Sequence, residues 1–165
     1  MKKYEVELFL EMIRDNKAAF FRASYSFLLN KEDAEDAVSN AVLKAYTHLS
    51  DLRSTRKMKA WFYGILVNEC KDMLRKQKQL CYVSYETEEA DIEKTGLDEE
   101  MPDLYRYICQ LEPVFREVII LFYFEGFNGK EIARMLDVPE GTVKSRLSRA
   151  KKKLKNFIEK EADIY

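Results

Sequence analysis

The residues best suited to chemistry lie together in one stretch, LDVPEGTVKSRLSRAKKKL, at residues 136–154. Val143, Leu147, Ala150 and Leu154 recur there at helical spacing, and most residues between them are lysine, arginine or serine. These polar side chains donate hydrogen bonds, and the lysines and arginines are positively charged. The chemistry available to them is noncovalent recognition of phosphates and base edges.

On a helix that advances about 100° per residue, the four apolar side chains form a single stripe. Arg149 points away from that stripe, where its guanidinium can make a bidentate contact with guanine. Ser145 also points outward and can bond bases or phosphates. We predict that six side chains on the outward side and its two edges contact DNA: Thr142, Lys144, Ser145, Arg146, Arg149 and Lys152.

The residues before this helix predict how it is held. Asn128 and Glu131 have the spacing of a capping box, which starts the short helix GKEIARML, and residues 137–139 (Asp-Val-Pro) end it. Two short helices joined by a tight turn, the second basic, predict a helix-turn-helix whose second helix enters the major groove. An isolated basic helix would more simply be a solvated surface, but the cap, turn and apolar stripe together favour DNA binding.

The whole sequence predicts an all-α fold, because it has only five glycines and three prolines and lacks strand-like alternation. We expect a helix or helix pair over residues 4–29, a helix capped by Asn30, and a third helix over residues 57–78. Pro113 divides the helical segment that begins at residue 103. The expected core stripe of that segment is Leu111, Phe115, Val118, Ile119 and Phe122.

Charge is nearly balanced, at −1 over 165 residues, but it is unevenly distributed. Residues 52–79 carry eight basic and two acidic residues, a net of +6, and residues 128–158 carry nine and three, again +6. Residues 86–103 carry nine acidic residues and one basic, a net of −8. Because local charge is what a polyanion meets, both basic segments are candidates to bind nucleic acid.

The acidic stretch has no apolar periodicity. We therefore predict two small helical domains, residues 1–79 and 103–165, joined by a flexible acidic linker over residues 80–102. A coil of this length would average about 25 Å from end to end and reach about 75 Å when stretched.

Several classes of protein are disfavoured. The longest apolar runs are far too short to cross a membrane, and the N-terminus does not resemble a signal peptide. The three cysteines are unclustered and His48 is the only histidine, so we expect reduced thiols in the cytoplasm, no metal site and no cofactor. Arg22, Ser24 and Ser26 could form a nucleophile cluster, but no acid–base pair accompanies them, so we expect no enzyme.

Residues 111–154 resemble the C-terminal promoter-binding domain of the extracytoplasmic-function sigma factors of bacterial RNA polymerase. The resemblance rests on Leu111, Pro113, Arg116, Leu121, Glu125-Gly126, Glu131-Ile132-Ala133, Val138-Pro139, Gly141-Thr142-Val143, Ser145-Arg146 and Arg149-Ala150. A similar EIA…GTV pattern occurs in response regulators, so the N-terminal half decides between the two families.

That half resembles the other sigma domain, in EDAEDAVSNAVLKAYTHL and KAWFYGILVNECKDMLRKQK. The matching residues are Asp36, Ala45, Tyr46, Trp61, Phe62, Ile65, Asn68, Asp72 and Arg75. Together the two matches cover nearly the whole chain in the expected order, without a third domain between them.

The resemblance implies that the first domain binds the polymerase core and opens the minus-ten promoter element, while the second reads the minus-thirty-five element. The implied partners are the clamp helices and flap of the core, duplex and melted promoter DNA, and an anti-sigma factor that can be membrane-anchored. No small-molecule substrate is implied.

The implied minus-ten residues are Arg53, Arg56, Lys57, Trp61, Asn68, Asp72, Arg75 and Lys76. Trp61 lies on an apolar stripe, so a core position is the alternative, and Asp72 could instead stabilise its helix by pairing with Arg75 or Lys76. The implied polymerase-binding residues are Glu32, Asp33, Asp36, Ser39, Asn40 and Leu43.

The sequence departs from the family pattern at three places. Ser39-Asn40 stands where the family usually has a Gln-acid pair, and Leu43 stands where an aromatic is frequent. Asp137 replaces the usual turn glycine, which Asp can do because it tolerates a left-handed backbone.

The main alternative is a one-component repressor or activator, in which an N-terminal effector domain precedes the helix-turn-helix. The basic surface of residues 53–78 argues against it, because an effector domain needs no second DNA-binding face.

Overall fold

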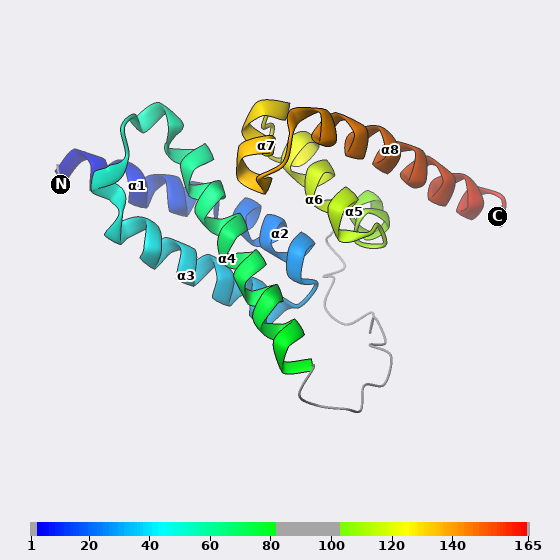
Figure 1. The fold of residues 1–165 in the computed structure, drawn as a ribbon, viewed down its shortest axis with the longest axis horizontal. Helices are drawn as coiled ribbons and strands as arrows, with labels where there is room; N and C mark the ends of the chain where they lie inside the picture. Colours follow the sequence, from blue (N-terminus) through cyan, green and yellow to red (C-terminus); the bar gives the residue numbers. More distant parts are fainter. Residues whose placement is uncertain (1–2, 82–102, 165) are drawn as a thin grey trace.

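The computed structural model describes residues 3–81 and 103–164, and every regular element within these ranges is helical (Figure 1). The all-α prediction is therefore confirmed for the described residues. Residues 82–102, which make up most of the predicted linker, lie outside them, and residues 80 and 81, the rest of it, are helical.

The N-terminal half contains α1 (Lys3–Asp15), α2 (Lys17–Leu28), α3 (Lys31–Thr47) and α4 (Met58–Cys81). Two 3₁₀ turns, η1 (Leu49–Asp51) and η2 (Thr55–Lys57), connect α3 to α4. The C-terminal half contains α5 (Asp103–Cys109), α6 (Pro113–Ile119), a π-helical turn η3 (Ile120–Phe124), α7 (Gly129–Leu136) and α8 (Glu140–Ala162).

Capping side chains set the helix starts as predicted. The Asn30 side chain accepts a 2.9 Å hydrogen bond from the Asp33 N–H at the start of α3. Asn128 and Glu131 form a complete capping box on α7, with bonds of 2.9 and 3.0 Å. Asp137 ends α7 in a left-handed conformation, with φ 54°, so the turn forms without glycine.

The N-terminal core is aromatic. Phe20 packs against Phe62 and Tyr63, with ring centroids 4.5 and 5.1 Å apart, and Phe9 lies 6.3 Å from Phe62. The side of α3 that faces this core consists of small, fully buried residues, which let α3 pack closely on α2 and α4: Ala34, Ala37, Ala41 and Ala45.

The two halves of the chain contact each other directly, since α2 packs on α6 and η3 while α4 packs on α7 (Figure 1). The buried carboxylate of Glu125, in the second half, joins them. It accepts a 2.6 Å hydrogen bond from the Tyr63 hydroxyl and a 3.1 Å bond from Arg22 in an ion pair. The Tyr63 and Phe127 rings pack edge-on beside it, 4.8 Å apart.

Arg116 makes a second connection between the halves, although only 3% of it is exposed. Its Nε donates to the Ser26 carbonyl of α2, and its Nη1 donates to the carbonyls of Cys109 and Leu111, at 3.2 and 3.1 Å. Burial lowers the pKa of this guanidinium, and the three carbonyls partly compensate its desolvation by accepting from Nε and Nη1. The periodicities that predict two tethered domains give no sign of this interface.

One predicted core residue is wrong. Phe122 is 37% exposed, whereas Ile120 and Leu121 are fully buried in its place. The cause is the π-helical turn η3, which closes with a 3.0 Å bond from the Glu125 N–H to the Ile120 carbonyl. A π turn holds more residues than an α turn, so it rotates the following side chains off the stripe that 3.6-residue periodicity predicts.

We predict that Tyr63→Phe lowers the free energy of unfolding by about 1.5–3 kcal/mol, because it removes a buried hydrogen bond to a carboxylate. Urea denaturation of the full chain measures this. Tyr46→Phe, at a tyrosine that is 44% exposed, is the matched control and should change stability by less than about 0.5 kcal/mol. Equal stability of wild type and Tyr63→Phe would contradict the role given to this bond.

Candidate nucleic-acid interface

Helix α8 buries the predicted stripe and leaves the opposite side open. Val143, Leu147, Ala150 and Leu154 are at most 9% exposed, and α8 packs on α6 and α7 through them. Lys144, Ser145, Arg149 and Lys152, all predicted DNA contacts, are exposed, and Thr142 and Arg146 are half-buried. The helix-turn-helix thus presents the donor-rich face that the sequence predicts.

A hollow of about 560 Å³ lies along one edge of α8, where the buried stripe meets the exposed side, since both Val143 and Lys144 line it. We call it the α8 groove; its lining residues are Phe122, Gly129, Glu140, Val143, Lys144, Leu147, Ser148, Lys151 and Lys152. Three lysines line it, so a negatively charged partner is favoured there.

Arg146 differs from the other predicted contacts because it pairs with Glu117 of α6, at 3.6 Å. Burial raises the pKa of the Glu117 carboxyl, and the nearby charges of Lys71 and Arg146 oppose that shift. Lys71 comes from α4 and donates a 2.9 Å hydrogen bond to the Leu136 carbonyl of α7. Arg146 therefore lies close to the contact between the halves and has a structural role.

Two lysines of the run 151–153, in the middle of α8, also make contacts within the protein. Lys153 bonds Glu112 at 2.6 Å and lies 5.2 Å from the centre of the Phe115 ring. Lys151 lies 5.5 Å from the centre of the Tyr123 ring. These contacts orient two of the three lysines.

The predicted minus-ten residues are distributed along α4 and the turn before it. Arg53, Arg56 and Lys57 lie in or beside η2, which precedes the helix, and Arg75 and Lys76 lie near its far end. Since α4 has 24 residues, it is about 36 Å long. The structure therefore does not gather these side chains into one cluster, but holds them in two groups, one at each end of α4, which we call the α4 cations.

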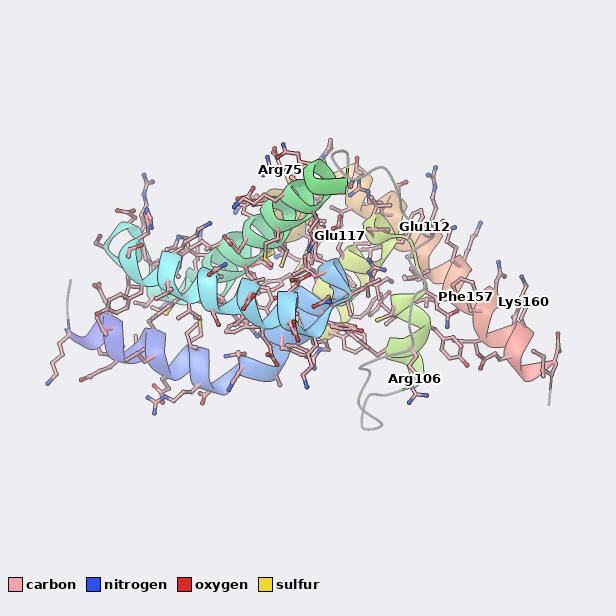
Figure 2. All side chains as sticks on the ribbon, turned by 90° about the horizontal axis from the view of Figure 1, so that it is seen from below. Arg75, Arg106, Glu112, Glu117, Phe157 and Lys160 are labelled. Carbon is pink, nitrogen blue, oxygen red and sulfur yellow. The ribbon has the colours of Figure 1, made fainter. Side chains whose placement is uncertain are left out.

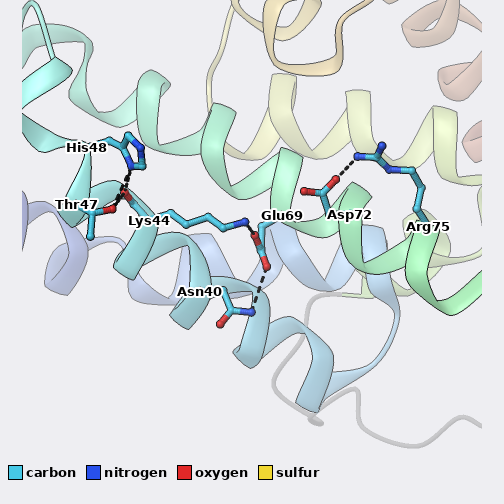
Figure 3. A network of polar contacts seen from close by, with 7 residues as sticks. All are labelled: Asn40, Lys44, Thr47, His48, Glu69, Asp72 and Arg75. Atoms are coloured by element: carbon cyan, nitrogen blue, oxygen red, sulfur yellow. Dashed lines mark hydrogen bonds and ion pairs between the residues drawn. The ribbon is translucent and has the colours of Figure 1, made fainter.

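Two predicted minus-ten residues take the structural roles that the sequence offers as alternatives, a core position and a pairing within the helix. Trp61 is half-buried and packs against the core, while its neighbour Phe62 is fully buried. Asp72 pairs with Arg75, three residues on, as Figure 3 shows. Asn68 is exposed, so its amide can reach a partner.

A polar network that the sequence analysis missed joins α3 to α4 (Figure 3). Glu69, 7% exposed, accepts a 3.1 Å hydrogen bond from the Asn40 amide and another from the Lys44 ammonium. The hydrogen bond to Glu69 raises the pKa of Lys44. A signal was present, because Glu69 is one of two acids in the basic segment 52–79.

The predicted polymerase-binding residues lie on α3. Glu32, Asp36, Ser39 and Leu43 are exposed, and Leu43 is 67% exposed, which is unusual for a leucine. Two others also contact α4: the Asn40 amide is bonded to Glu69, and Asp33 accepts a 2.8 Å bond from Gln77. The exposed part of α3 is thus both acidic and apolar.

The possible nucleophiles have structural positions. Ser24 and Ser26 are buried and donate to the carbonyls of Phe20 and Ala23, at 2.9 and 2.6 Å. Burial raises the pKa of the Cys70 thiol to about 12, so it remains protonated at neutral pH. Among the described residues, no cluster could hold a metal ion, and no helix is long and apolar enough to span a membrane.

Comparison with known proteins agrees with this geometry. Residues 12–79 match the family Sigma-70 region 2, and residues 102–154 match Sigma-70, region 4. The chain is 34% identical to the RNA polymerase sigma factor SigV of Bacillus subtilis, over 98% of each chain. It is 26% identical to the ECF RNA polymerase sigma factor SigW of the same organism, over 94% of this chain and 91% of that one.

Two solved structures are similar in fold. One is the sigma factor RpoE in complex with the anti-sigma factor NepR from Bartonella quintana, with a TM-score of 0.70 and 25% identity, covering 90% of this chain and 97% of that one. The other is CnrH in complex with the cytosolic domain of CnrY, with a TM-score of 0.64 and 23% identity, covering 92% and 87%. The fold and the two matched regions define an RNA polymerase sigma factor. The chain belongs to the extracytoplasmic-function sigma factors.

We predict that Arg146→Ala lowers the free energy of unfolding by about 1–2 kcal/mol, because it removes a partner of the buried Glu117 carboxylate. Arg149→Ala, at an exposed position on the same helix, should change it by less than about 0.5 kcal/mol. Urea denaturation of both variants tests the distinction. Equal losses of stability would show that Arg146 is not structural.

Proposed function

We propose that this sigma factor directs the bacterial RNA polymerase core to specific promoters and initiates transcription there. The observation that carries the proposal is the donor face of α8, which stays open while its apolar stripe is buried. Family membership over both halves of the chain supports the same function. A one-component repressor is disfavoured, because the N-terminal half matches a sigma region in place of an effector domain.

We assign minus-thirty-five recognition to residues 103–165, where α8 enters the major groove. Arg149 and Lys144 are the candidates for contact with guanine, and Ser145 for a base or phosphate. Lys152 adds positive charge, and its contact is to phosphate. Thr142 and Arg146, at the edge of the face, orient the helix on the duplex.

We assign minus-ten opening to residues 1–79, through the α4 cations. Their positive charge suits the phosphates of a separated strand. Asn68 and the turn that carries Arg53, Arg56 and Lys57 hold an unstacked base. The Glu69 network fixes α3 against α4, so the surface that binds polymerase and the surface that binds DNA keep a constant relation.

The polymerase clamp helices bind the exposed face of α3 through Leu43, Asp36 and Glu32. Asn40 contributes less than the sequence analysis expects, since its amide is already bonded to Glu69. A helix that carries acids in its first turns and an exposed leucine further along suits a basic protein partner with an apolar contact. The polymerase flap contacts the C-terminal domain.

Promoter elements one and a half helical turns apart lie roughly 50 Å from each other. Residues 82–102, the part of the proposed linker beyond α4, would reach about 70 Å when stretched, which spans that distance. Two halves in direct contact cannot reach elements that lie this far apart. The contact between the halves therefore opens when both elements are bound.

We further propose that the protein is cytoplasmic, has no catalytic activity, cofactor or small-molecule substrate, and is held by an anti-sigma factor. Where that factor is membrane-anchored, it would retain the protein at the inner face of the membrane. The two similar structures support this partner, because one is described as bound to an anti-sigma factor and the other to the cytosolic domain of CnrY.

Arg149→Ala should lower transcription from a promoter with an intact minus-thirty-five element about 10-fold, because one bidentate base contact contributes about 1–3 kcal/mol. Run-off transcription with purified polymerase core measures this. Arg106→Ala is a charge-matched control, since Arg106 is exposed and extends from α5 away from the helices in Figure 2. Loss of core binding by Arg149→Ala would contradict the division of labour.

Leu43→Asp should weaken binding to the polymerase core at least about 10-fold, because it places a charge at the apolar centre of the proposed contact. Fluorescence titration of labelled protein with core gives the affinity. Leu10→Asp, at a leucine of α1 that is 45% exposed, should bind normally. If both variants bind core as well as wild type, α3 is not the polymerase-binding surface.

A further inference from the structure

The π-helical turn η3 turns two large aromatic side chains out of the core. Phe122 is 37% exposed and Tyr123 51%, and their rings pack edge-on with centroids 4.9 Å apart. In a regular helix, Phe122 would continue the buried stripe of Val118 and Ile119. π turns are rare in proteins, but those that occur are frequently found at functional sites. The exposure of Phe122 at such a turn therefore calls for a functional explanation.

Phe122 lines the α8 groove, across from the donors of the recognition helix. Gly129, the first residue of α7, and Lys144 and Ser148 of α8 line the same hollow. Lys151, another lining residue, lies over the Tyr123 ring. An exposed aromatic ring thus shares one hollow with three lysines and a serine. This combination of positive charge and hydrogen-bond donors is typical of a helix that reads DNA.

Charge identifies the occupant of the groove. Lys144, Lys151 and Lys152 all line it, and Glu140 is its one acid. The groove is also continuous with the proposed minus-thirty-five surface, because Lys144 belongs to both. A duplex whose major groove holds α8 would therefore bring base edges to the ring of Phe122.

We propose that Phe122 is a base-contacting residue of this sigma factor, which packs against the C5-methyl group of a thymine in the minus-thirty-five element. Thymine methyl is the apolar group that base pairs expose in the major groove, so it is the feature that an aromatic ring can recognise there. The inference rests on the proposed function and adds an apolar contact to the polar contacts of α8.

A double-mutant cycle tests the contact. Holoenzyme formed from the full chain and polymerase core is assayed on a mapped promoter in which each thymine of the element, on either strand, is replaced singly by uracil, which lacks the methyl group. At one position wild type should lose about fourfold in promoter affinity, the effect of about one buried methyl group. Phe122→Ala should lose at least as much on the thymine promoter and nothing further with uracil at that position.

Two variants serve as controls. Phe122→Leu keeps an apolar side chain and should retain part of the preference for thymine. Tyr4→Ala removes an aromatic that is 64% exposed on α1 and should behave as wild type. Thermal denaturation of Phe122→Ala should match wild type, since the ring is not part of the core. If Phe122→Ala is unstable, Phe122→Leu alone decides. In that case, an undiminished thymine preference of Phe122→Leu together with wild-type promoter affinity overturns the contact.

Three other results overturn the inference. Additive effects of Phe122→Ala and uracil would mean that a different residue reads the methyl group. No uracil effect in wild type would mean that no methyl is read. Weaker binding of Phe122→Ala to core without DNA would mean that the groove holds a protein segment. The proposed function fails separately, if wild-type holoenzyme ignores changes throughout the minus-thirty-five element.

Discussion

Helix α8 must bury a narrow apolar stripe and leave its remaining surface in water, and the C-terminal half is arranged around this constraint. Val143, Leu147, Ala150 and Leu154 seat the helix on α6 and α7, so of the predicted DNA donors only Arg146, which pairs with Glu117, also takes part in packing. The capping box at Asn128 and the left-handed turn at Asp137 fix the angle at which α8 departs. Recognition of a polyanion follows from the surface that remains.

In the N-terminal half, a buried carboxylate holds the helices in place. Glu69, on α4, binds Asn40 and Lys44, which are one turn apart on α3, and so holds α3 and α4 in a fixed relation. Glu125 does the same between the halves, through Tyr63 and Arg22. A buried carboxylate is tolerated only when donors compensate it, so each network stabilises one specific arrangement.

Local patterns predicted much of the fold. Periodicity and capping residues gave the helices, both caps at Asn30 and Asn128, and the buried stripe and open donors of α8. They could not predict the pairing of Tyr63 with Glu125, because those residues are 62 positions apart and periodicity carries no information about distant partners. They failed at Phe122, because a π turn changes the period itself. The partners of Asn40 and Arg146 could not be predicted either, because each of these residues is bonded to a distant residue on another helix.

The most direct test is run-off transcription with purified polymerase core and the full chain, followed by mapping of the start sites. The account predicts discrete starts, each preceded by two sequence elements about one and a half helical turns apart, and only weak binding of the free protein to duplex DNA. Tight binding of the free protein to a palindromic duplex as a dimer, with no stimulation of the core, would contradict it.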